Sequence, residues 1–275
     1  MLIDPGKCVA CANCVPVCPM GAIYIDRAIN RATINRDECV ECGTCSRMSS
    51  EHLNPTMVRT IRNLSKIFRI RFEPEPDVCP TTAFVVDELD WPRIARRVFS
   101  DPLVEHKSTG IQGRGTEEVK TNDVAHRVAV GEVGYVIELG RPGVGVRFHQ
   151  IQSMTMTLAK LGVKFEAKNP ISKLMTDPST GALKEDLLNE KILSAIVEIT
   201  TTTDMVATVL DTVKRVARQV DTVIAIGVST RCDDSGEDPV LAPLLDGLGY
   251  APARAKTNMG LGRVTNIQAK ETAGD

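Results

Sequence analysis

The pattern of apolar and polar positions changes at about Arg127. Beyond it, apolar-rich runs over residues 127–139, 163–168, 192–200 and 222–228 predict β-strands. Residues 148–161 and 204–220 carry apolar side chains at helical spacing and predict two helices between the strands. The predicted order of elements in this region is therefore β-α-β-β-α-β.

That order belongs to the split βαβ fold, also called ferredoxin-like, a name that implies nothing about iron–sulfur binding. We expect an α+β domain over residues 126–232, followed by an extended C-terminal tail, 233–275, with one short helix near 241–245. Small-molecule sensors and protein-docking domains both use this fold, so the fold does not by itself indicate a function.

Before Arg127, an amphipathic helix is predicted from about residue 55 to residue 70. Asn54 can cap it, and Pro55 suits a first-turn position. We expect its apolar stripe to pack on the rest of the N-terminal region; the stripe consists of Met57, Ile61, Leu64 and Phe68. The opposite face is either solvated or a docking patch for an acidic partner or an anionic substrate; it carries Arg59, Arg62, Lys66 and Arg69.

Composition sets broad limits. A chain of 275 residues with 43% hydrophobic and 25% charged residues is typical of a soluble globular protein with two folded units. A net charge of −2 gives no sign of a nucleic-acid partner, and no apolar run reaches the length of a membrane span, so we expect neither. The first residues lack the pattern of a signal peptide, which favours the cytoplasm, where thiols stay reduced.

The number and spacing of the nine cysteines bear on the chemistry of the protein. Seven lie between Cys8 and Cys45, an eighth is Cys79, and Cys232 is far from the others. An odd number of cysteines in a reducing compartment indicates metal binding rather than disulfides. Zinc sites usually consist of two separated Cys-x2-Cys pairs. This chain instead has two Cys-x2-Cys-x2-Cys triplets, each followed later in the sequence by a Cys-Pro pair.

The cysteine region is an internal repeat. Residues 3–14 match residues 34–45, and residues 18–26 match residues 79–87. The second half is thus the first half with residues 46–78 in place of residues 15–17. Each half therefore supplies a cysteine triplet and one later Cys-Pro.

Residues 1–90 resemble a bacterial-type dicluster ferredoxin with a helical insertion at 46–78. The resemblance implies two [4Fe–4S] clusters and one-electron transfer at low potential, and in such proteins the fourth cysteine of a run ligates the other cluster. The expected ligands of the first cluster are Cys8, Cys11, Cys14 and Cys79. Those of the second cluster are Cys39, Cys42, Cys45 and Cys18. His52 is an alternative to Cys79, unless it is a solvated loop histidine.

Residues 91–125 form a predicted connector with one short helix over 92–99. Its polar part is either an exposed linker or a loop that closes over a neighbour or a ligand. Residues 99–123 contain Phe-Ser-Asp-Pro and Gly-Arg-Gly-Thr-Glu-Glu-x-Lys-Thr-Asn-Asp, a pattern similar to a segment of 6-hydroxynicotinate reductase and related ferredoxin-containing reductases of anaerobic ring reduction. The similarity implies an electron-delivering subunit, because the chain is short for such an enzyme and has no flavin motif.

The glycine-rich segment 140–145 lies between a predicted strand and a predicted helix. It is either a tight turn or, with Arg141 and Arg147, an anion site at a helix N-terminus. We expect His149 to be structural and Cys232 to act as a small apolar side chain at the end of the last strand.

Together these patterns predict an electron-transfer protein, the electron-delivering subunit of an anaerobic reductase or oxidoreductase complex rather than a complete enzyme. No side chain is placed as an acid–base or nucleophilic catalyst. Two alternatives stay open. One is a regulatory protein that senses redox state or a metabolite, and the other is a reductase subunit that contributes part of a substrate pocket.

Overall fold

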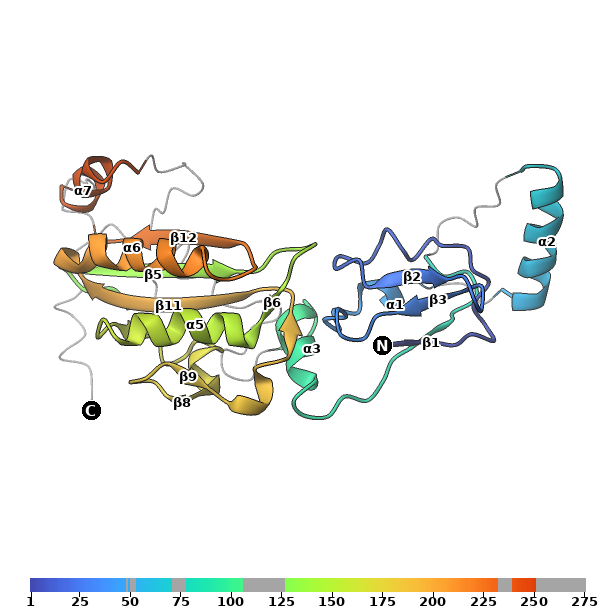
Figure 1. Ribbon diagram of the computed structural model, residues 1–275, viewed down its shortest axis with the longest axis horizontal. Helices are drawn as coiled ribbons and strands as arrows, with labels where there is room; N and C mark the ends of the chain where they lie inside the picture. The colour runs from blue at the N-terminus through green and yellow to red at the C-terminus, as the bar shows by residue number, and fades with distance from the viewer. Residues whose placement is uncertain (48, 50–52, 71–77, 106–126, 232–238, 251–275) are drawn as a thin grey trace, which may run out of the picture.

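The computed structural model describes residues 1–47, 49, 53–70, 78–105, 127–231 and 239–250. Two lobes follow one another along the chain, and the helix α3 (Ile94–Ser100) lies between them (Figure 1). The cysteine-rich N-terminal lobe is built from short elements, whereas the C-terminal lobe is built on a four-stranded sheet. Within these residues, no helix has the length and apolar character needed to cross a membrane.

Two antiparallel pairs of short strands frame the N-terminal lobe. β1 (Leu2–Ile3) pairs with β4 (Phe84–Val85), and β2 (Ile23–Asp26) pairs with β3 (Arg31–Ile34). The internal repeat is visible in these pairs, because Ile3 faces Phe84 just as the equivalent Ile34 faces Ile23. A short helix, α1 (Thr44–Arg47), begins within the second cysteine triplet.

The insertion contains the helix α2 (Pro55–Ile67), which begins as expected. Pro55 lies in the first turn, and the side chain of Asn54 accepts hydrogen bonds from the backbone amides of Thr56 and Met57 at 2.9 and 3.2 Å. These contacts satisfy two of the amides that a helix leaves without partners at its start.

The orientation of α2 is the reverse of the predicted one. The apolar stripe faces solvent, with exposed fractions between 39% at Ile61 and 72% at Phe68. Arg59 and Arg62 instead face the N-terminal lobe and donate hydrogen bonds to its backbone carbonyls. The prediction was wrong because the loop beneath α2 offers carbonyl oxygens, which need donors, rather than an apolar surface.

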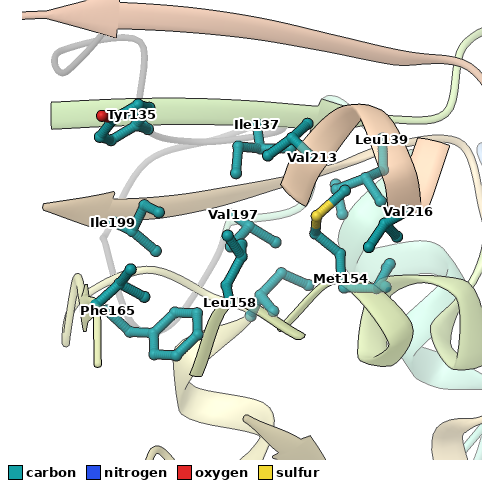
Figure 2. Packing of buried hydrophobic residues seen from close by; sticks show 14 of the residues in the cluster. Tyr135, Ile137, Leu139, Met154, Leu158, Phe165, Val197, Ile199, Val213 and Val216 are labelled. Atoms are coloured by element: carbon teal, nitrogen blue, oxygen red, sulfur yellow. The ribbon is translucent and has the colours of Figure 1, made fainter. Parts of the chain in front are cut away.

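The C-terminal lobe contains an antiparallel sheet in the order β12-β5-β11-β7. Its strands are β12 (Ile224–Ser229), β5 (Glu132–Leu139), β11 (Ala195–Thr202) and β7 (Lys164–Phe165). The helices α5 (Phe148–Ala159) and α6 (Val206–Ala217) pack on one face. Figure 2 shows Ile137 of β5 and Val197 of β11 packed with Leu158 of α5 and Val213 of α6.

Smaller elements lie between α5 and β11 in the sequence. They are β8 (Met175–Asp177), β9 (Ala182–Leu183) and β10 (Lys191–Ile192), with 3-10 turns at Ser172–Leu174 and Glu185–Leu187. β10 pairs with β6 (Val146–Arg147), just before α5. A further 3-10 turn, Thr203–Met205, precedes α6, and α7 (Leu241–Gly247) is the last helix of the described residues. The predicted strand over 163–168 is reduced to β7.

Replacing Leu158 by Ala is expected to destabilise the C-terminal lobe by roughly 2–5 kcal/mol, because the side chain is fully buried between α5 and the sheet. Met156 of the same helix is 38% exposed, so Met156→Ala is the matched control, with an expected loss below about 1 kcal/mol. Hydrogen exchange of the β5 and β11 amides measures both effects. Equal losses for the two variants would contradict this core.

Candidate metal centres

Eight cysteines of the N-terminal lobe gather around two separate cavities. The first is lined by Cys8, Cys11, Cys14 and Cys79, and the second by Cys18, Cys39, Cys42 and Cys45. The two cavities have empty volumes of about 300 and 370 Å³, part of which is open to solvent. All eight thiols are free of disulfides. Cys232 and His52 lie outside the described residues, as do most of segment 99–123 and much of the tail.

Equivalent backbone conformations build the two cavities. Ala10 and Glu41, each two residues after the first cysteine of a triplet, have φ angles of 54° and 56°. The amide of Ala22 donates to the Sγ atom of Cys18 at 3.2 Å, and the amide of Ala83 donates to Cys79 at 3.1 Å. Cys79 therefore has the same local geometry as Cys18, despite the insertion before it.

The arrangement of the thiols suits a cluster better than a single ion. Across the described ranges, no three Cys, His, Asp or Glu side chains converge closely enough to hold one metal ion. A zinc ion draws its ligands around one centre, whereas the thiolates of a cubane cluster bind separate iron atoms at its corners. Burial raises the pKa of the Cys14 and Cys45 thiols to about 12, so their protons stay in place at neutral pH unless iron displaces them.

An arginine pair on α2 holds the loop of the first cavity. Arg59 donates to the carbonyls of Gly6 and Cys8, and Arg62 donates to those of Val9 and Ala10. We call Arg59 and Arg62 the α2 arginine pair. It ties the insertion helix to the loop between Gly6 and Ala10.

A second pair, Arg93 and Arg96, holds the equivalent loop of the second cavity. Arg96 is 3% exposed and donates to the carbonyls of Asp37 and Cys39 at 2.7 and 2.9 Å. Arg93 donates to the carboxylate of Glu41 at 2.6 and 3.0 Å. We call Arg93 and Arg96 the α3 arginine pair. Sequence reasoning missed this pair, although both pairs share the spacing Arg-x2-Arg.

The second cavity lies against the C-terminal lobe. Leu193 packs against the buried cluster of Met20, Ala22 and Val40, as do Cys39 and Cys42. The amide of Gly143 donates to the carbonyl of Pro19 at 2.5 Å. A Cβ atom at Gly145, where φ is +67°, would lie 2.7 Å from Met20 Cε. The segment 140–145 is thus a tight turn that packs on the N-terminal lobe.

Ion pairs reinforce this contact between the lobes. Arg147 bonds to Asp37 at 2.6 Å and holds the pKa of that carboxyl below its usual range. Lys191 pairs with Glu38, and Arg96 pairs with Glu190. Arg147 is therefore engaged in the interface between the lobes. This contact does not favour the alternative hypothesis from the sequence, in which Arg147 holds an anion.

Comparison with known proteins finds similarity in the N-terminal lobe. Residues 1–48 match the family of the 4Fe-4S dicluster domain. Two relatives, both named Ferredoxin-1 and both from Rhodobacter capsulatus, are each 45% identical to this chain over 42 residues. The match covers 15% of this chain and 62% of each relative, less than two thirds of their length. No solved structure matches the chain.

The N-terminal lobe therefore contains a ferredoxin-type dicluster domain, and its cofactors are two [4Fe–4S] clusters. The predicted resemblance of the N-terminal region to a dicluster ferredoxin and the predicted cofactors are confirmed. Such a domain supports iron–sulfur electron transfer.

Replacing Arg96 by Ala is expected to lower the stability of the protein by roughly 3–5 kcal/mol, because the change leaves Glu190 and the carbonyls of the second loop without their donor. Arg215→Ala, at an exposed position of α6, is the control and should have little effect. Thermal unfolding under anaerobic conditions compares the two. A similar small loss in both would contradict a structural role for Arg96.

Proposed function

We propose that this protein transfers single electrons through two [4Fe–4S] clusters and delivers them to a partner oxidoreductase. The observation that carries the proposal is the pair of cavities, each lined by four cysteines in repeated local geometry. The first cluster has the ligands Cys8, Cys11, Cys14 and Cys79. The second cluster has the ligands Cys18, Cys39, Cys42 and Cys45.

The clusters supply the redox chemistry, since each accepts and releases one electron without bond making. The residues of the chain bind the clusters, limit water and set the electrostatic field. Apolar side chains such as Ile3 and Phe84 at the first cavity and Val40 at the second restrict solvent access. Backbone amides that donate to cysteine sulfurs stabilise the negative charge of the reduced state.

We divide the chain into a cluster domain, residues 1–90 with its insertion at 46–78, a connector, 91–125, a second domain, 126–232, and a C-terminal tail, 233–275. The second domain is assigned to the split βαβ fold, a proposal supported by the sheet order β12-β5-β11-β7 with α5 and α6 on one face. The similarity of segment 99–123 to ferredoxin-containing reductases favours a role as the electron-delivering subunit of an anaerobic reductase complex.

The partner is an oxidoreductase that docks on the exposed face of α2. This face combines large apolar side chains, Leu64 at 52% and Phe68 at 72% exposure, with the exposed cations Lys66 and Arg69. Residues 53–70 contain no Asp or Glu, so a complementary surface is apolar and rimmed by carboxylates. Of the four basic residues expected to form the patch, Arg59 and Arg62 are engaged with the cysteine loop.

Replacing Cys79 by Ala is expected to disrupt the first cluster alone, since the four ligands of the second cluster stay intact. Iron per chain should fall below about eight, and the reduced protein should lose one of its two cluster signals in electron paramagnetic resonance. Cys232→Ala and His52→Ala are the controls and should keep full iron. Full iron in Cys79→Ala together with a loss in His52→Ala would refute this ligand assignment.

Replacing Leu64 by Glu is expected to abolish partner binding without loss of iron, because it adds a negative charge to the apolar face. Asn63→Glu makes the same charge change beside that face and serves as the control. Anaerobic co-purification compares both variants with the unchanged protein. An oxidoreductase retained by all three proteins would rule out this docking face.

A further inference from the structure

The two arginine pairs are equivalent in geometry but differ in charge balance. Arg59 and Arg96 occupy matching places, because each donates to the carbonyl of the first cysteine of its triplet, Cys8 or Cys39, at 3.1 and 2.9 Å. Both helices, α2 and α3, lie outside the repeat. The two cysteine loops are thus held by the same kind of contact, made by unrelated segments of the chain.

At the second cavity, carboxylates pair with both arginines, although the amino group of Met1 adds a third positive charge to the two carboxylates. Arg93 pairs with Glu41 at 2.6 Å, and Arg96 pairs with Glu190. The side chain of Glu41 is fully buried and also receives the amino group of Met1. For the α2 arginine pair, no ion pair with a carboxylate occurs among the residues that the structure describes. Within the described residues, the two guanidinium charges beside the first cavity therefore have no carboxylate partner.

Equivalent loop positions differ in charge at the two cavities. Arg62 donates to the carbonyls of Val9 and Ala10 in the loop of the first cavity. The residue equivalent to Ala10 in the second loop is Glu41, whose carboxylate is buried in the lining of the second cavity. A positive charge beside a cluster favours its reduced form, because reduction adds negative charge.

Hydrogen bonds to sulfur act in the same direction. At the first cavity the amides of Ala10 and Ala32 donate to Cys8, and the amide of Ala83 donates to Cys79. At the second cavity the described bonds to sulfur are the amide of Ala22 to Cys18 and the hydroxyl contact of Thr44 with Cys42. Donors near sulfur stabilise the more negative, reduced cluster and raise its potential.

We propose that the first cluster, beside the α2 arginine pair, has a higher midpoint potential than the second cluster, beside the C-terminal lobe. With the clusters held by their cysteines, the charges of the chain would favour the extra electron on the cluster beside α2. The inference deepens the proposed function and rests on its ligand assignment. Cysteine burial alone favours the opposite order, since Cys8, Cys14 and Cys79 are buried, but unbalanced guanidinium charges outweigh this modest difference.

The test is a potentiometric titration of the intact, anaerobically purified protein, followed by electron paramagnetic resonance. Arg62→Gln removes one charge beside the first cluster while keeping a donor for the loop. Glu190→Gln removes the carboxylate that balances Arg96 beside the second cluster. Lys66→Gln, at an exposed position of α2 outside the pair, is the matched control for the loss of one positive charge.

The expected result is two reduction steps at different midpoint potentials. Arg62→Gln should lower the potential of the higher step, and Glu190→Gln should raise the potential of the lower step. Lys66→Gln should change neither potential appreciably. If Arg62→Gln moves the lower step, or if Lys66→Gln has an equal effect, the proposed order is overturned. Iron analysis of the same samples separates the two claims. About eight irons with a reversed order overturns this inference alone, whereas fewer irons overturns the ligand assignment and the inference with it.

Discussion

Coordination of iron by cysteine thiolates is the constraint on which the N-terminal lobe depends. Its strands, β1 to β4, are two to four residues long, and the apolar cluster around the first cavity includes the cysteines themselves together with Ile23 and Val78. Such a small core cannot offset the entropy lost on folding without a further contribution. Metal ligation supplies it, because binding energy at sites absent from the unfolded chain becomes folding energy.

The helices around the cysteine loops supply hydrogen-bond donors to the backbone of those loops. Loops that turn their amides toward sulfur leave carbonyl oxygens on their outer side, and buried carbonyls require donors. The two arginine pairs meet this need at both cavities, one from the insertion and one from the connector. The same requirement explains why α2 turns Arg59 and Arg62 inward and leaves its apolar stripe exposed. Arg96 also joins the second cavity to the C-terminal lobe, because it forms an ion pair with Glu190.

Sequence reasoning could predict what spacing and repetition encode. The two cysteine groups, the start of α2 at Asn54 and Pro55, and the order of the long elements after Arg127 all follow from local patterns. The orientation of α2 could not be predicted, since the hydrophobic-stripe rule assumes an apolar surface beneath the helix. The role of Arg96 depends on contacts with Asp37 and Glu190, both distant in sequence. The small strands between α5 and β11 carry too few residues for a periodic signal.

The central claim is that each cavity holds one [4Fe–4S] cluster, with Cys18 and Cys79 exchanged between the two halves of the repeat. An iron anomalous difference map from an anaerobically grown crystal tests it most directly. The account predicts two compact peaks, one bounded by Cys8, Cys11, Cys14 and Cys79 and the other by Cys39, Cys42, Cys45 and Cys18. A single peak, or a first cluster whose fourth ligand is a residue other than Cys79, would contradict it.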